Sequence, residues 1–385
     1  MKQNNRQFRW LSWVVVALLL LLSMPFGKVV VEAQTAADPL IMVMNGDLWS
    51  WTSDGNLRQL TTWGLNEDLV ISPDGTKVAY SSLSRGFKEW LHSITTGTGG
   101  YQAPSNIWLL DVQSGQTVRI ADQQPDAQWN GISVPGKYTL RTRPSWSPDS
   151  QHLAWTEIQI DTPRSVYDLN GSKAHLVVWD VKDNSTHVLD ANLISPVPHE
   201  LDLDIKWGRP GIGLMSGWQP GQASDAELRV YEPVSGKLIT QVTVPNAYSM
   251  YWLEWIQSGG VDYLFNSLSP DDATWLNWQT AQADVRPSTP QLVSLTAGNS
   301  ASFSRKDRHL ILTFPGQKPI DLGDKMDVYG ISRDGQQVAY GYREVTPDNL
   351  GYLTHIIIGS AGQATEIKPY KGINQVIWGP TGWRY

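Results

Sequence analysis

A short turn recurs along this chain, each time after an aromatic or aliphatic residue and before an apolar strand. Two copies are nearly identical, at residues 71–75 (ISPDG) and 146–150 (WSPDS). Proline presets the backbone at the second position, aspartate bonds to its own backbone, and glycine accepts a positive φ, so each copy builds a tight turn. Weaker copies follow at Trp207, Trp255, Phe303, Ile331 and Trp378.

A second series of segments alternates with these turns. Each is a strand, a short polar turn and a strand, which is typical of a hairpin, and they begin at Asp47, Asn106, His175, Glu227 and Thr354. From residue 40 onward the strands are rich in Val, Ile, Trp, Tyr and Thr and show almost no helical period, so the fold class is all-β. Alternating the two series gives units of four strands, a to d, and about 40 to 50 residues, the period of a propeller blade.

We therefore expect a single β-propeller over residues 40–385. Seven blades are predicted, with six as the alternative because the interval from Phe303 to Ile331 is too short for four strands. The strand at residues 39–44 (PLIMVM) stands just before the first c–d hairpin, and the marker at Trp378 lacks a strand pair. We expect the N-terminal strand to pair with the last blade and close the ring, which removes open sheet edges.

The quoted strings also carry a resemblance. The stretch PSWSPDSQHLAWTE, beside DLWSWTSDGNLRQL, resembles the TolB-type, WD40-like (PD40) propeller repeat, strongly in the first two units and loosely afterwards. The later markers keep the aromatic residue but lose Ser-Pro-Asp at Trp207, Trp255 and Trp378. The resemblance implies a propeller that binds partners. We expect these aromatics and Trp146 to pack between neighbouring blades, because a flat ring buries a large area there.

The N-terminal segment is typical of an export signal. Lys2, Arg6 and Arg9 precede an apolar run over residues 10–24, and small residues follow up to Ala33. We interpret residues 1–33 as a signal peptide and 34–39 as a linker, with retention as an N-terminal anchor as the alternative. The protein is then exported to the periplasm, the cell surface or the medium, and meets a membrane only through an uncleaved N-terminal segment.

The composition excludes several kinds of chemistry. The chain has no cysteine, which rules out disulfide frameworks, thiolate metal sites and cysteine nucleophiles. Its net charge is −7, and the N-terminal segment is itself basic, so nucleic-acid binding is not expected. There is neither an HExxH pair nor a GxSxG elbow. We therefore predict no cofactor and favour a protein that is not an enzyme.

Loop lengths differ between the two faces that a propeller must have. The a–b and c–d turns share one face, the turn face, and are mostly short. The b–c and d–a connections share the opposite face, here called the connection face, and the long segments of the chain are of this kind. They carry aromatic and arginine residues, which are enriched in binding hot spots. The candidate binding residues are Trp90, His92, Tyr101, Trp129, Tyr138, Arg141, Arg143, Arg164, Tyr167, His199 and Trp218, with Tyr352 in a further long loop.

Two functions of different class follow from these observations. The first is an exported, non-catalytic scaffold that binds a protein or a cell-envelope polymer through the connection face. The second is a metal-dependent hydrolase, lactonase or lyase at the mouth of the channel. Its weak candidate ligands, which stand before a-strand markers, are Asp202, Asp204, Glu254 and Asp327. We favour the scaffold, since acidic residues of this kind are more often solvated at an edge.

Overall fold

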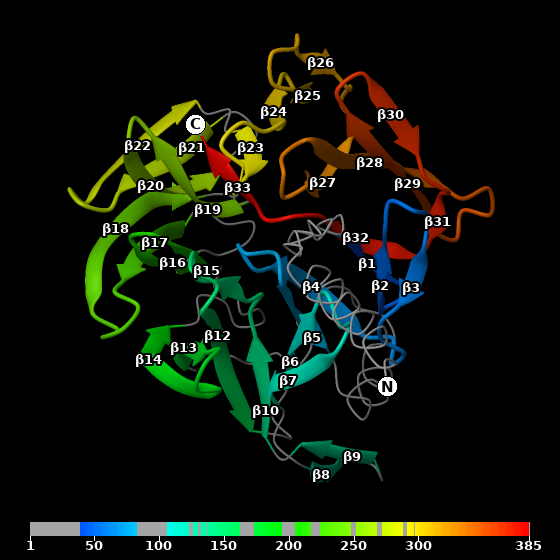
Figure 1. Cartoon of the computed structure of the whole chain (residues 1–385). Coiled ribbons are helices and arrows are strands. Elements are labelled where there is room, and N and C mark those ends of the chain that lie inside the picture. Colours follow the sequence, from blue (N-terminus) through cyan, green and yellow to red (C-terminus); the bar gives the residue numbers. More distant parts are fainter. Residues whose placement is uncertain are drawn as a thin grey trace, which may run out of the picture. The chain divides into compact units, whose positions relative to one another are not determined.

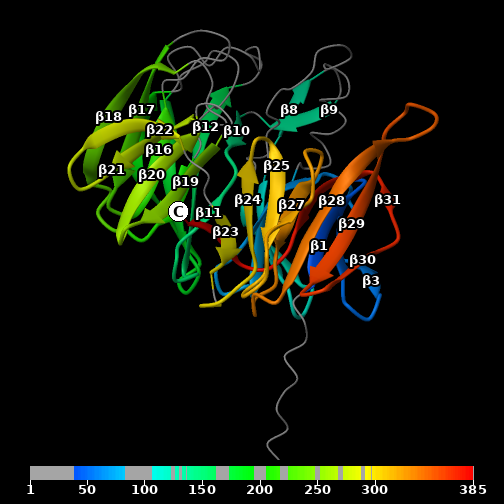
Figure 2. The same cartoon turned by 90° about the horizontal axis from the view of Figure 1, so that it is seen from above.

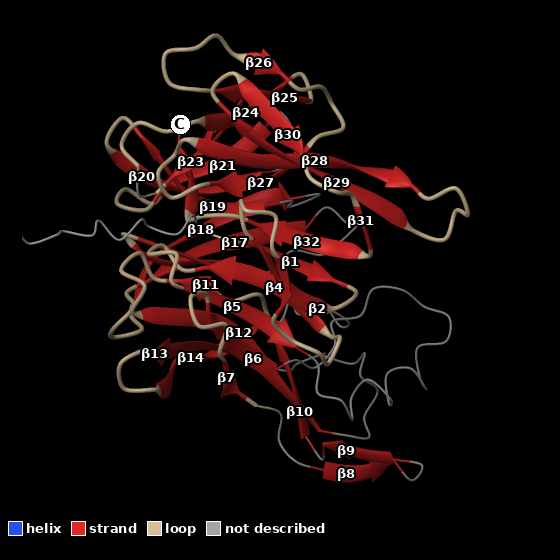
Figure 3. Ribbon diagram, turned by 45° about the vertical axis from the view of Figure 1, so that its right-hand side comes forward, coloured by secondary structure: helices blue, strands red, loops and turns tan. Residues whose placement is uncertain are grey.

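The structure is a computed structural model that describes residues 39–82, 106–122, 126–129, 132–135, 137–161, 173–194, 205–216, 224–247, 252–267, 272–287, 291–295 and 297–384. The described part consists of strands joined by turns, and it contains no helix that could cross a membrane (Figure 3). Its seven four-stranded antiparallel blades form a β-propeller around a central channel (Figure 1). The predicted fold class and the count of seven blades are confirmed.

The first three blades follow one another along the chain. Blade 1 consists of β4 (Asn66–Ile71), β5 (Lys77–Ser82), β6 (Asn106–Asp111) and β7 (Thr117–Ala121). Blade 2 has an inner position shared by β10 (Lys137–Arg141) and β11 (Ser145–Trp146), followed by β12 (His152–Asp161), β13 (Lys173–Asp180) and β14 (Ser185–Ile194). Blade 3 consists of β15 (Ile205–Gly208), β16 (Gly211–Ser216), β17 (Ser224–Tyr231) and β18 (Leu238–Ala247).

The next three blades repeat this order. Blade 4 consists of β19 (Trp252–Ser258), β20 (Val261–Ser267), β21 (Asp272–Asn277) and β22 (Gln282–Pro287). Blade 5 consists of β23 (Gln291–Ser294), β24 (Ser302–Lys306), β25 (His309–Thr313) and β26 (Ile320–Asp321). Blade 6 consists of β27 (Asp327–Ile331), β28 (Gln337–Val345), β29 (Tyr352–Ser360) and β30 (Gln363–Glu366), and β31 (Tyr370–Lys371) also pairs with β29.

Blade 7 closes the ring with strands from both ends of the described chain. Its inner strand is β32 (Ile373–Ile377), and its other strands are β1 (Leu40–Met44), β2 (Asp47–Trp51) and β3 (Leu57–Gln59). The closure is antiparallel, with Met42 opposite Val376. The predicted pairing of the N-terminal strand with the last blade is therefore confirmed. The pairing covers the edges of β1 and β32 that face each other, which would otherwise be open.

The turn marker at Phe303, like the other markers, was predicted to follow the inner strand of a blade, and this prediction is wrong. Phe303 lies in β24, the second strand of blade 5, and the inner strand β23 ends at Ser294. Ser294 is completely buried, and its hydroxyl donates to the Arg333 carbonyl of blade 6 at 3.1 Å. Leu295 follows it where blades 1 and 2 have Pro73 and Pro148, so the sequence cue is missing. Blade 5 is complete but short, because its outer strand has only two residues.

Tight turns join the first and second strands of blades 1, 2 and 6 in one geometry. The hydroxyls of Ser72, Ser147 and Ser332 each donate to the aspartate two residues later at 2.6 Å. Each hydroxyl also accepts the amide five residues later, at 3.0, 2.8 and 2.9 Å. The turn is thus closed by its own side chains, which explains why Ser-x-Asp recurs.

The recurring tryptophans join neighbouring blades, as predicted. Trp146 is 5% exposed, packs among residues of blades 1 and 2, and donates its Nε1 proton to the Val70 carbonyl at 3.1 Å. Trp255 donates in the same way to the Lys206 carbonyl of blade 3 at 3.0 Å. Trp378 packs in a cluster shared by blades 6 and 7, and Trp207 stacks on His152 of blade 2. These rings remove apolar area from water, and those of Trp146 and Trp255 also satisfy their N–H groups.

One strand lies outside the seven blades and borders the channel. The strand β33 (Thr381–Arg384) pairs antiparallel with the inner strand β23 and makes a single parallel pair with the inner strand β19. Just before it, the Trp378 amide donates to the Tyr329 carbonyl of blade 6 at 2.9 Å. The segment after blade 7 therefore runs along the inner edges of blades 6, 5 and 4, and joins blades 4 and 5 into one continuous sheet.

Candidate functional site

The two faces of the propeller differ in the way that loop lengths predicted. Seen from the side, the hairpin of β8 (Asp126–Trp129) and β9 (Ile132–Pro135) and the far end of the β28–β29 hairpin project on the connection face (Figure 2). The opposite, turn face carries short turns. The c–d stretch near residues 280–289 has no clear assignment from the sequence; in the structure it contains β22, and a short turn joins β22 to β21.

Most candidate residues of the connection face lie outside the described residues. These are Trp90, His92, Tyr101, Arg164, Tyr167, His199 and Trp218. The structure gives the backbone of two more, Trp129 in β8 and Tyr138 in β10. Their role in binding stays a prediction.

Arg141 and Arg143 are both candidate binding residues of the connection face, and the structure gives them different surroundings. The Arg141 side chain is 6% exposed, and its Nε donates to Glu157 Oε2 at 2.9 Å, which ties β10 to β12. Its Nη2 donates to the Asp122 carbonyl at 2.9 Å. Arg143 is exposed and lines the central channel, where its Nη2 donates to the Leu69 carbonyl of blade 1 at 3.0 Å.

Tyr352 lies at the tip of the β28–β29 hairpin, directly opposite Val345. Tyr352 is 55% exposed, Val345 52% and Leu350 81%. The turn between them is ordered by Thr346, whose hydroxyl donates to Asp348, and by the Leu350 amide, which donates to the same carboxylate at 3.1 Å. These hydrogen bonds lower the pKa of Asp348 to about 2, so the carboxylate is charged at neutral pH.

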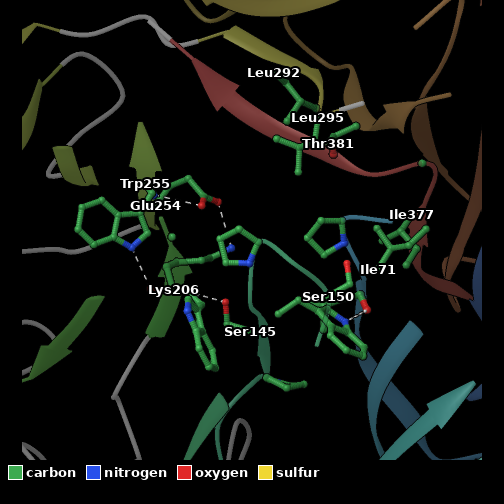
Figure 4. Close-up of a pocket in the computed structure, with 18 of the residues that line it drawn as sticks. Ile71, Ser145, Ser150, Lys206, Glu254, Trp255, Leu292, Leu295, Ile377 and Thr381 are labelled. Atoms are coloured by element: carbon green, nitrogen blue, oxygen red, sulfur yellow. Dashed lines mark hydrogen bonds and ion pairs between the residues drawn. The ribbon is translucent and has the colours of Figure 1, made fainter. Parts of the chain in front are cut away.

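The central channel contains a cavity of about 920 Å³ that is lined by all seven blades (Figure 4). Residues of the a–b turns, such as Asp74 and Asp149, belong to its lining, so it reaches the turn face. Most of its charged groups already have partners. Lys206 Nζ lies 3.0 Å from Glu254 Oε2. Arg209 Nη2 donates to both carboxylate oxygens of Asp262, at 2.8 and 2.9 Å.

The inner strand of blade 1 is bulged beside this cavity. The register of β4 against β5 shifts between Glu67 and Val70, and Asp68 has a left-handed φ of 56°. Burial raises the pKa of Asp68, although the nearby charge of Arg143 opposes the shift. Burial also raises the pKa of Glu67, and the Asp68 carboxylate adds to that effect. The bulge thus places two neighbouring acidic groups in the inner strand beside the cavity.

The residues proposed as metal ligands do not gather into a site among the described residues. Glu254 is paired with Lys206, and Asp327 Oδ2 lies 3.9 Å from Arg343 Nε. Asp202 and Asp204 lie outside the described residues. In the described ranges, no three His, Cys, Asp or Glu side chains are arranged to hold a metal ion.

Two features, the ordered turn at the β28–β29 tip and part of the channel lining, were not predicted from the sequence. The ordered tip at residues 346–349 reads TPDN, a variant of the Ser-Pro-Asp-Gly turn that could have been found by allowing threonine and asparagine. Gln375 and the apolar lining residue Leu292 carry no local signal, because only the ring arrangement brings their strands to the channel.

The described residues define the protein as a seven-bladed β-propeller with a central cavity. No protein-family model matches the sequence, and no curated protein matches it significantly. Among solved structures, TolB from Acinetobacter baumannii is similar over 90% of this chain and 66% of that chain, with 13% identity and a TM-score of 0.38. A prolyl endopeptidase structure is similar over 88% of this chain and 50% of that chain, with 14% identity and a TM-score of 0.49.

A third structure is an oligogalacturonate lyase from Vibrio parahaemolyticus, similar over 85% of this chain and 92% of that chain, with 12% identity and a TM-score of 0.43. The chain spans about two thirds of the TolB structure and half of the prolyl endopeptidase. These likenesses concern the fold alone, because one fold hosts many functions. No activity is carried over from them.

Proposed function

We propose that this protein is an exported, non-catalytic β-propeller that holds a protein or a cell-envelope polymer against its connection face. One observation carries the proposal: three exposed apolar residues, Val345, Leu350 and Tyr352, lie at the tip of the β28–β29 hairpin on that face. Leu350, at 81% exposed, has an apolar side chain almost wholly in water. Apolar and aromatic side chains on a preformed loop lose little conformational entropy on binding and are favoured at interfaces.

The turn face offers less to a partner. Its a–b turns in blades 1, 2 and 6 direct their serine and aspartate side chains into the turns themselves. The β8–β9 and β28–β29 hairpins project on the opposite face, to which the sequence assigns the long connections with their aromatic and arginine residues. This asymmetry supports the connection face as the binding surface.

The N-terminal segment supports export. The basic residues before the apolar run at 10–24, and the small residues after it, are typical of a signal peptide. The proposed location is therefore the periplasm, the cell surface or the medium, with an uncleaved segment as a possible anchor. The metal-dependent enzyme is not favoured, because Glu254 and Asp327 both face cationic side chains among the described residues.

Photo-crosslinking in the producing cell tests the proposal. A photoreactive residue is placed singly at Leu350, Tyr352, Trp90, Trp129 or Trp218, and Asp54 in the β2–β3 turn serves as the control on the turn face. We expect discrete adducts, or a ladder from a polymer, at connection-face positions and none at Asp54. Adducts at Asp54 alone, or none at any position, would overturn the proposal.

A matched pair of substitutions checks that an adduct reports binding. Leu350→Asp should abolish the adduct formed from position 352, because it places a charge in the apolar tip. Val234→Asp, at a residue 85% exposed in the β17–β18 turn, should leave it unchanged. Equal loss with both changes would mean that the adduct does not depend on the tip.

A further inference from the structure

The cavity in the channel has two chemically different sides. Apolar side chains of blades 5, 6 and 7 line one side, among them Leu292, Leu295, Val328 and Ile377. Charged side chains of blades 2, 3 and 4, among them Arg143, Lys206 and Glu254, belong to the rest of the lining, and Figure 4 shows Lys206 and Glu254 apart from Leu292 and Leu295. A volume of about 920 Å³ is within the range that holds a small organic ligand.

Arg143 differs from the other charged groups of this lining. The remaining cations are in ion pairs, Lys206 with Glu254 and Arg209 with Asp262. Arg143 makes no ion pair within 4 Å among the described residues. Its Nη2 donates to the Leu69 carbonyl at 3.0 Å, and Arg143 is an exposed residue that lines the cavity. A guanidinium uses two parallel N–H groups to bind a carboxylate, so one edge can hold Leu69 while another binds a ligand.

The acidic groups near Arg143 do not replace such a ligand. Asp68 is the nearest in electrostatic effect, but burial raises its pKa, which makes it a weaker counter-ion than an exposed aspartate. Asp74 and Asp149 receive hydrogen bonds from Ser72 and Ser147 within their own turns. A cation without an ion pair that lines the same cavity as apolar side chains favours an anion with an apolar body.

The apolar wall supplies the second half of the site. Leu295 is 45% exposed although it lines the cavity, so its side chain has apolar area that a ligand could cover. Leu292 of β23, at 8% exposed, lines the same cavity. Burial of apolar area from both partners gains free energy without adding specificity, and the charge fixes the orientation.

We propose that the channel cavity binds a small apolar carboxylic acid, with its carboxylate on Arg143 and its apolar body against Leu295 and the neighbouring apolar wall. This site lies at the turn-face side of the channel and goes beyond the binding surface on the connection face. It involves no chemical step.

The test measures binding of two fluorescent probes to the full chain. The probes are 11-(dansylamino)undecanoic acid and its methyl ester, which share an apolar body and differ in charge. We expect the acid to bind at least about tenfold more tightly than the ester, the ratio expected for a charged hydrogen-bonded pair. Arg143→Gln should reduce acid binding to the ester's level and leave ester binding unchanged, while Arg143→Lys should restore part of the preference.

Two further variants complete the design. Leu295→Gln should weaken both probes, and Arg58→Gln, the same exchange as Arg143→Gln at an exposed residue of β3, should affect neither. Circular dichroism confirms that each variant is folded. Equal binding of acid and ester, an unchanged preference in Arg143→Gln, or no binding of either probe would overturn the inference. Tyr352→Ala should leave probe binding intact, so failure here and failure of the connection-face proposal are distinguishable.

Discussion

The side-chain amide of Gln375 binds both polar groups of Leu69, a residue 306 positions away in the sequence. The Leu69 amide donates to Gln375 Oε1 at 2.8 Å, and Gln375 Nε2 donates to the Leu69 carbonyl at 3.1 Å. Because β4 is bulged at this point, Leu69 lacks a partner in β5. A side chain of blade 7 therefore supplies hydrogen bonds to the backbone N–H and C=O of a residue in blade 1. Arg143 of blade 2 also donates to the Leu69 carbonyl.

Gln375→Ala should lower the free energy of unfolding by about 1–3 kcal/mol, because it leaves the buried Leu69 amide without its partner. Chemical denaturation monitored by tryptophan fluorescence measures the change. Gln363→Ala, at an exposed residue of β30, is the control and should be neutral within about 0.5 kcal/mol. Equal stability of the two variants would show that the Gln375 bonds contribute nothing.

Asp68→Asn should raise the melting temperature at neutral pH. Burial raises the pKa of Asp68, so its ionised form opposes folding above that raised pKa. As the pH falls through the raised value toward 3.8, the wild type takes up the proton and the advantage of the variant disappears. Asparagine also accepts the left-handed φ of 56° at this position.

Asp54→Asn should change the melting temperature at neutral pH in the opposite direction. The Thr52 hydroxyl and the Asn56 amide lower the pKa of Asp54, so its charge supports folding above 3.8 and loses that effect as the pH falls through the lowered value. We expect Asp54→Asn to lower the melting temperature at pH 7 and to match the wild type in acid. Thermal scans between pH 3 and 8 compare both variants, and a shared sign at pH 7 would contradict this account.

Gly330→Ala should destabilise the protein by about 3 kcal/mol or more, since strain and a steric clash coincide there. Gly330 has a φ of +145°, and a Cβ atom would lie 1.9 Å from the Trp378 carbonyl oxygen, where blade 6 meets the segment after blade 7. Gly316→Ala is the matched control, with a φ of +72° and open space around it, and should cost only about 1–2 kcal/mol. Urea denaturation of the two variants gives the difference.

Ser147→Ala should cost about 1–3 kcal/mol, because the hydroxyl is buried and both donates to Asp149 and accepts from the His152 amide. The comparison is Ser114→Ala, whose hydroxyl donates to Asp111 in an exposed c–d turn. That change should stay within about 0.5 kcal/mol. Differential scanning calorimetry on both variants checks the ranking, and the reverse order would exclude a structural role for the a–b turn serine.

Much of the fold could be predicted because its signals are local. The turns at Ser72 and Ser147 require particular residues at adjacent positions, so their copies could be counted along the sequence. The error at Phe303 has the same origin. In blade 5, Ser294 is followed by Leu295, so the Ser-Pro-Asp-Gly pattern is absent. Only the buried serine remains of that pattern, and its hydrogen-bond partner, the Arg333 carbonyl, belongs to the next blade.

The sequence by itself determined the all-β class, the seven repeats and the closure of the ring, since alternating strands and tight turns are specified by residues close together in the chain. Only the tertiary structure decided which groups line the channel. Arg143, Gln375 and Leu295 come from separate blades, and β33 pairs with strands far from it in sequence. Contacts across a ring depend on how the blades are arranged around the axis, and no local pattern encodes that arrangement.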